Sequence, residues 1–266
     1  MKKYIFLLFC LNLVLLSSCK KDIEIDYHQV DPIYVVEASV SNEGMEARIS
    51  QTNNMDDNST TSNIDNAVVV VTGSDGSSKT LTYSKNGIYK SSAVGTPDVE
   101  YTIDIQFDGH HFTSSSIMQK MPKMNKFRFI RKKIMTENYQ MGELLLQDIP
   151  NEENWYFMHI YRNDLGYRWA VKRDDQNPNG ELQQLFAFNK EGSTDQDRLR
   201  EGDELEAQVR TIDERSYEYL YTLLLMDNTG TNPIYNFTGG CLGYFSAFSL
   251  MGYGIEFRTE YVQEEE

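Results

Sequence analysis

Three oxygen-bearing side chains stand at alternate positions of one polar segment, at Asp175, Asn177 and Asn179, and a glycine follows them. This spacing is typical of the first half of a calcium-binding loop, in which the glycine lets the chain turn around a hard cation. The twelfth position, where the helical form of the loop carries a bidentate glutamate, is Phe186. The segment is therefore a candidate metal site, and a polar hairpin turn is the alternative explanation.

Four aromatic residues lie close together on one predicted β-hairpin: Trp155, Tyr161, Tyr167 and Trp169. Aromatic side chains on a sheet surface form platforms on which sugars stack. Aromatic residues are also favoured in strands for packing alone. The four residues are a candidate ligand-binding platform, with core packing as the alternative.

Groups for nucleophilic or metal catalysis are sparse in the sequence. The sequence has no Gly-x-Ser-x-Gly elbow, and its four histidines form no His-Glu-x-x-His pattern. The histidines are His28, His110, His111 and His159. Cys241 lies between glycines and apolar residues, so we expect burial as a small hydrophobic side chain. The sequence predicts no catalytic residue, no cofactor and a protein that is not an enzyme.

Strand-like alternation dominates residues 32–120. Val99, Tyr101, Ile103, Ile105 and Phe107 alternate with polar residues, which predicts a strand with one buried face. Three dipeptides supply hairpin turns between short strands, since they tolerate positive φ angles; they are Asp75-Gly76, Asn86-Gly87 and Asp108-Gly109. About seven strands at this spacing predict an immunoglobulin-like β-sandwich.

Residues 121–126 are predicted to link this sandwich to a second β-rich domain over 127–262, so the fold class is all-β. The second domain carries one helix near 213–227, for which Thr211 and Glu214 are a candidate capping box. Two final strands are predicted over 242–251 and 255–262, before an acidic tail at 263–266.

The chain begins with two lysines and an apolar run, Tyr4 to Leu16, as secretory signals do. The following residues, Ser17-Ser18-Cys19, complete a pattern that resembles the bacterial lipobox. That resemblance implies a signal peptide over 1–18, cleavage between Ser18 and Cys19, acylation of Cys19 by chains such as palmitate, and a tether over 19–31. The apolar run is shorter than the roughly 20 residues that span a bilayer.

The balance of charge limits the possible partners. The chain has 25 Lys and Arg against 40 Asp and Glu, a formal net charge of −15. Such a charge repels nucleic acid, whose binding depends on basic side chains. Membrane contact is therefore expected through the lipid anchor. The stretch Lys20-Lys21-Asp22-Ile23-Glu24-Ile25-Asp26 resembles the signal that exports lipoproteins of the Bacteroidota to the outer face of the outer membrane. A plain solvated tether is the alternative.

Several short motifs recur together in one order. They are Asp148-Ile149-Pro150-Asn151-Glu152-Glu153-Asn154-Trp155-Tyr156, Glu201-Gly202-Asp203, Tyr217-x-Tyr219-Leu220 and Gly239-Gly240-x-Leu242-Gly243-Tyr244-Phe245. In this order the chain resembles the Bacteroidota lipoprotein family called domain of unknown function 4249. The family has no established catalytic residues, and its members often accompany TonB-dependent receptors of the outer membrane.

The resemblance implies a binding or accessory subunit beside a TonB-dependent nutrient transporter. Two alternatives stay open at the level of sequence. One is a surface hydrolase or protease that acts on polymers, and the other is a purely structural or adhesive surface protein.

Overall fold

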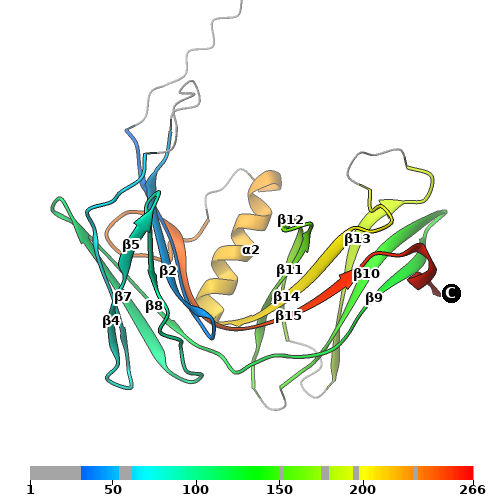
Figure 1. The fold of residues 1–266 in the computed structure, drawn as a ribbon, viewed down its shortest axis with the longest axis horizontal. Helices are drawn as coiled ribbons and strands as arrows, with labels where there is room; N and C mark the ends of the chain where they lie inside the picture. Colours follow the sequence, from blue (N-terminus) through cyan, green and yellow to red (C-terminus); the bar gives the residue numbers. More distant parts are fainter. Residues whose placement is uncertain are drawn as a thin grey trace, which may run out of the picture. The chain divides into compact units, whose positions relative to one another are not determined.

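The computed structural model describes residues 31–53, 62–149, 152–174, 180–193, 198–229 and 233–265. The chain divides into two units, Met1–Asp31 with Asn54–Ser59 and Pro32–Asn53 with Thr60–Glu266, and every element below belongs to the second. The described residues form sixteen β-strands, one α-helix and one short 3-10 helix, η1 (Thr259–Tyr261) (Figure 1). The prediction of an all-β, sandwich-type fold with one helix is confirmed.

One sheet of eight strands runs through both halves of this unit. Its strand order is β12-β11-β14-β15-β1-β2-β6-β5. The bounds are β1 (Tyr34–Ser41), β2 (Gly44–Gln51), β5 (Thr82–Lys85), β6 (Ile88–Ser91), β11 (Trp155–Arg162), β12 (Leu165–Arg173), β14 (Glu204–Ile212) and β15 (Leu242–Glu256). All neighbouring pairs are antiparallel except β1 and β15, which run parallel.

Two four-stranded sheets complete the fold. The order of the first is β4-β3-β7-β8, with β3 (Val68–Gly73), β4 (Ser78–Thr80), β7 (Glu100–Phe107) and β8 (His110–Ile117). The order of the second is β13-β10-β9-β16, with β9 (Lys123–Ile134), β10 (Glu137–Gln147), β13 (Glu181–Lys190) and β16 (Gln263–Glu265). Residues 32–120 thus contribute eight strands, close to the predicted seven.

The first core lies between β4-β3-β7-β8 and the β15-β1-β2-β6 part of the long sheet. The predicted alternation of β7 is confirmed, because Tyr101, Ile103 and Ile105 are buried in this core. The core also contains Phe237 and Phe245, which lie far beyond residue 120 in the sequence. The first sandwich is therefore completed by the last part of the chain.

The second core lies between β13-β10-β9 and the β12-β11-β14-β15 part of the long sheet. Its buried side chains include Phe129 and Leu144 from one sheet and Met158 and Val209 from the other. The predicted linker, residues 121–126, overlaps this region, since β9 begins at Lys123. Glu181–Lys190, which the sequence pattern did not single out, forms β13 and pairs with β10.

Strand β15 contributes to both cores from one face. Phe245 and Ala247 lie in the first core, while Met251 and Ile255 pack against the second. The prediction of two strands here was wrong, because pairing with β14 continues through Gly252 and Gly254. At its start, Gly243 has a φ of 100°, and a Cβ atom there would lie 1.9 Å from the main-chain oxygen of Val36.

Helix α2 (Glu214–Thr229) contacts β11, β12 and β15 on the face of the long sheet opposite the second core (Figure 1). A third apolar cluster joins them, with Phe157, Ile212 and Leu220 buried in it. The predicted capping box was wrong. Asp213 caps the helix instead, since its Oδ1 accepts a hydrogen bond from the Ser216 amide at 2.9 Å.

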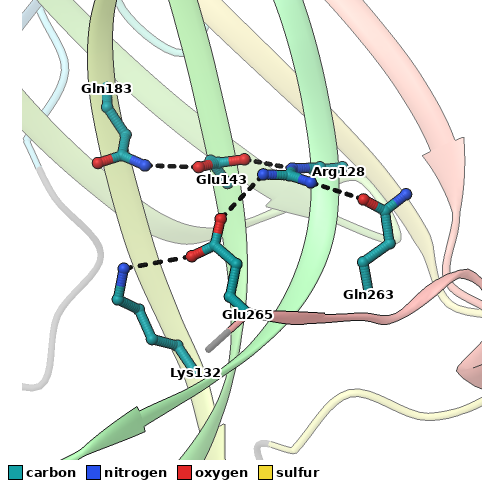
Figure 2. A network of polar contacts seen from close by, with 6 residues as sticks. All are labelled: Arg128, Lys132, Glu143, Gln183, Gln263 and Glu265. Carbon is teal, nitrogen blue, oxygen red and sulfur yellow. Dashed lines mark hydrogen bonds and ion pairs between the residues drawn. The ribbon is translucent and has the colours of Figure 1, made fainter.

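The last residues pair with the edge of the second four-stranded sheet, because β16 runs parallel to β9. Figure 2 shows the polar contacts that hold it. Arg128 donates to Glu265 at 2.9 Å and to Gln263 at 2.6 Å, and Lys132 donates to Glu265 at 3.2 Å. Arg128 also pairs with the buried Glu143. Residues predicted as an acidic tail thus supply a bound edge strand.

Candidate functional site: a cleft on the open face of the long sheet

The long sheet has one face that turns away from both cores, and we call it the open face. Side chains alternate between the two faces of a strand. In β1, Val36, Ala38 and Val40 enter the first core, so Glu37 and Ser39 lie on the open face. In β14, Leu205, Ala207 and Val209 enter the second core, which leaves Glu206, Gln208 and Arg210 on the open face.

A cleft of about 870 Å³ is formed on this face by strands from both halves of the long sheet. Its walls include Glu37, Lys90, Tyr161, Arg210, Tyr244 and Phe248. A second hollow of about 630 Å³ shares Glu43, Tyr161, Asp164, Glu206 and Leu250 with it. The two hollows therefore adjoin along β14 and β15.

Two tight turns contribute to the walls. Asn163 and Asp164, between β11 and β12, have φ angles of 49° and 64°, as the two central residues of a type I′ turn require. This turn places Asp164 at the cleft. Asn42, between β1 and β2, donates to the carbonyl of Leu250 at 3.0 Å and accepts from its amide at 2.7 Å. These bonds fix the β1–β2 turn, which carries Glu43, beside β15.

Arg210 lies between two aromatic rings within the cleft. Its Cζ is 5.2 Å from the ring centroid of Phe157 and 4.9 Å from that of Phe248, distances at which a cation is attracted to a ring. Its Nη2 donates to the Tyr161 hydroxyl at 3.4 Å and to Gln208 Oε1 at 3.3 Å. Its Nε is buried without a hydrogen-bond partner.

Carboxylates surround this cation at a distance. Glu37, Glu43, Glu46, Asp164 and Glu206 line the cleft. Glu46 pairs with Lys90 at 2.7 Å, and both side chains are about half exposed. Among the ion pairs of the described residues, none includes Arg210. The cleft thus offers a half-buried guanidinium inside an acidic rim.

The charge of Arg210 affects its neighbours. Burial, followed by the positive charge of Arg210, lowers the pKa of His159 to about 4, so this imidazole is neutral at neutral pH. Its ring stacks on Tyr161 with a centroid distance of 4.1 Å. Burial raises the pKa of Tyr244, whose hydroxyl stays protonated. The groups beside Arg210 are therefore neutral, and they can donate hydrogen bonds or stack.

The four aromatic residues predicted from sequence lie on the β11–β12 hairpin but not on one surface. Trp155 and Trp169 pack into the third cluster, where Trp169 contacts Phe157 edge to face. Tyr167 packs against the second core and under Arg168, whose Cζ is 4.1 Å from its ring. Tyr161 alone of the four lines the cleft.

The other residues considered from sequence are placed as follows. Cys241 is buried in the first core, as predicted, and burial raises the pKa of its thiol to about 12. His110 packs against Tyr34 with the two rings tilted, while His111 pairs with Asp104 at 2.6 Å, so the two adjacent histidines lie on opposite faces of β8. Ser18, Cys19, His28, Asp175, Asn177 and Asn179 lie outside the described residues.

No three His, Cys, Asp or Glu side chains within the described ranges gather as a ligand set for a metal ion. None of the helical segments in those ranges combines the length and apolar character needed to cross a membrane.

Sequence analysis missed Arg210 and its neighbours, although part of the signal was present. The alternation of Leu205, Ala207 and Val209 implied an opposite face with Arg210 on it. That Glu37 lies near this face follows from the parallel pairing of β1 with β15, in which Glu37 stands opposite Tyr244. No local sequence pattern predicts that segments so far apart in the chain pair with each other.

The fold and the cleft define a class of protein: two β-sandwich cores that share one sheet, with a polar hollow on its outer face. The model of the family described as domain of unknown function (DUF4249) matches residues 20–249, and the chain belongs to that family. The matched range includes the first core, α2 and most of the second core, and it ends before Phe257 and β16. No curated protein matches the chain.

Proposed function

We propose that the protein is a lipid-anchored binding subunit of the bacterial outer membrane that holds a polar ligand in the open-face cleft. In this proposal Cys19 carries the lipid, and the protein presents its ligand to a TonB-dependent transporter at the cell surface. The ligand carries an acidic group that binds Arg210, together with hydroxyl or ammonium groups that face the acidic rim.

The environment of Arg210 is the observation that carries the proposal. The guanidinium group is half buried and lines the cleft, and a hydrogen bond to a charged group contributes about 1.5–3 kcal/mol. Arginine presents its donors in a fixed fork that matches carboxylate and phosphate oxygens. The rings of Phe157 and Phe248 hold this fork in place, so little side-chain entropy is lost when a ligand binds.

The anchor is supported by the sequence of the amino-terminal region. The family model begins its match at residue 20. The lipobox-like residues Leu16-Ser17-Ser18-Cys19 come directly before it. An acidic chain gains nothing from an anionic membrane surface, so acyl chains on Cys19 would supply the membrane affinity.

The experiment that tests the assembly is recovery of the tagged protein with its partners from native envelopes. We expect one outer-membrane receptor to co-purify with the wild-type protein and to be lost with Cys19→Ala, which cannot be acylated. Recovery of the intact lipoprotein alone, at every detergent strength, contradicts the accessory role.

The cleft is tested separately, through the small molecules that the purified protein releases on denaturation. Mass spectrometry is expected to find an acidic compound with the wild-type protein and not with Arg210→Gln. Arg48→Gln is the matched control, because Arg48 is exposed in β2 and does not line the cleft. Equal recovery from both variants would rule out Arg210 as the binding group.

A further inference from the structure

Four polar side chains share one end of the second core, away from the cleft: Asp148, Asn154, Tyr156 and Asp174. Asp148 is 2% exposed, Asn154 1% and Tyr156 0%. In β10, Leu144 and Leu146 point into the core, and Asp148 continues this series at the next inward position. Polar groups therefore replace apolar ones where the core ends.

The β11–β12 hairpin brings Asn154 and Asp174 to the same place. Trp155 stands opposite Arg173 in the register, and the next pair outward is Asn154 with Asp174. The amide of Asp174 donates to the carbonyl of Asn154 at 2.9 Å. Residues directly opposite each other project from the same face, and Tyr156 shows that this face is the inward one.

The carboxyl group of Asp148 contacts two of these residues. The Tyr156 hydroxyl donates to its Oδ1 at 3.3 Å. The carboxyl group of Asp174 lies within hydrogen-bonding reach of that of Asp148. Two carboxylates so close together and out of water cannot both keep their negative charge at low cost unless a proton or a cation lies between them.

Three oxygen atoms in this group are buried without a hydrogen-bond partner: Asp148 Oδ2, Asp174 Oδ2 and Asn154 Oδ1. Lys172 stands opposite Tyr156 on the same strand pair, but its ammonium group donates to the carbonyl of Gln183 at 2.6 Å. Buried polar atoms in native proteins nearly always have a partner, so three unpaired acceptors in one place need an explanation.

We propose that Asp148, Asp174 and the side-chain oxygen of Asn154 bind a calcium ion at the end of the second core. Calcium takes six to eight oxygen ligands, drawn from carboxylates, amide carbonyls and water. Two carboxylates match the charge of the ion, Asn154 Oδ1 adds a neutral donor, and water fills the remaining positions. The ion would tie β10 to the β11–β12 hairpin and so join the two layers of the second sandwich.

The test is titration of the chelator-treated, purified protein with calcium chloride, by calorimetry and by thermal unfolding. We expect one ion per chain and a midpoint of unfolding that rises with calcium concentration. The variant Asp148→Asn/Asp174→Asn keeps the shape of both side chains and is expected to lose the binding and the shift together. The variant Asp174→Asn alone, at a half-buried position, is expected to weaken binding at least about tenfold, because one charge is lost.

Glu204→Gln/Glu256→Gln is the matched control, since these two glutamates stand opposite each other on β14 and β15 but are exposed. It is expected to bind calcium as the wild-type protein does. The proposal is overturned if millimolar calcium gives the wild-type protein neither heat of binding nor a higher midpoint of unfolding. That result is expected if Asp148 and Asp174 only share a proton. It is equally overturned if Asp174→Asn binds with wild-type affinity.

Discussion

The two cores bury different kinds of polar group. In the first core the buried polar side chains are neutral, and several make short hydrogen bonds within the protein, while Asn236 Nδ2 has no partner. Ser114 donates to the carbonyl of Asn236 at 2.7 Å, and Asn236 Oδ1 accepts from the Phe245 amide at 2.7 Å. In the second core and at its edge the buried polar groups include carboxylates, with Glu143 at 1% exposure and Asp203 at 9%.

Arginine side chains pair with both of these carboxylates. Glu143 pairs with Arg128 and also accepts from Gln183 (Figure 2). Asp203 pairs with Arg162 at 2.7 Å. The difference teaches that two sandwiches sharing one sheet depend on different forces. The first is specified by shape and neutral hydrogen bonding, and its stability should respond little to pH, whereas the second depends on ion pairs with little access to water.

The largest effect is expected from Phe245→Ala in the first core. Phe245 is fully buried, and removal of such a ring costs about 3–5 kcal/mol through lost burial and the cavity that remains. Because no charge is involved, the loss in the free energy of unfolding should be the same at pH 7 and pH 4.5. Urea unfolding at both pH values measures it, and a loss that changes with pH contradicts the comparison.

A slightly smaller effect, about 3 kcal/mol at pH 7, is expected from Arg128→Met in the second sandwich, because a buried carboxylate loses its partner. Burial alone would raise the pKa of Glu143, but hydrogen bonds from Arg128 and Gln183 outweigh it, and the pKa lies below its ordinary 4.5. The pair therefore stabilises the protein above pH 4.5, and this contribution is lost as the pH falls through the lowered pKa.

In Arg128→Met the same carboxyl group accepts a proton readily, so the gap to the wild-type protein should narrow as the pH falls. Urea unfolding between pH 7 and pH 3.5 measures the gap. Lys90→Met is the control, since its ion pair with Glu46 is about half exposed and contributes less than about 1 kcal/mol. A gap that is constant with pH would show that packing of Arg128, not charge, accounts for the loss.

The smallest effect is expected at His159, where the open face meets the third cluster. Its pKa is lowered from 6.5 to about 4, so the unfolded chain binds a proton more readily than the folded one. The free energy of unfolding is therefore unaffected by the titration of His159 above pH 6.5. It falls as the pH decreases from 6.5 towards 4, by about 1–2 kcal/mol because the group is partly exposed. His159→Gln should show a shallower slope of unfolding free energy in this window. Identical slopes for the wild-type protein and the variant would refute the lowered pKa of His159.

Much of the first sandwich could be predicted from local patterns. The alternation over Val99–Phe107 gave β7, and Asn86-Gly87 and Asp108-Gly109 have the positive φ angles that their turns require. The helix was also predicted, since its apolar spacing is visible in the sequence. Its cap was misassigned because Thr211 belongs to β14, and the capping residue is Asp213, which lies between the strand and the helix.

Long-range pairing and buried charge could not be predicted. Glu143 looks like an ordinary surface residue until β13 and β9 place Gln183 and Arg128 beside it. The cleft has the same origin, because Arg210 and Glu37 share a face only through the pairing of β1 with β15. The local sequence predicts which side chains of a strand are buried and which are exposed. The strands that pair with it depend on segments far away in the sequence.

That parallel pairing has a consequence for how the chain is made. Asn42 bonds to Leu250, 208 residues later, so the edge of β1 that faces β15 stays unpaired until Leu250 has left the ribosome. Non-local pairing of this kind slows folding and leaves strand edges open to other chains. A nascent chain truncated before Leu242 would retain most of its strands and lack the one that protects β1. Such fragments should aggregate, and a factor that holds the chain open until synthesis ends would raise the yield of native protein.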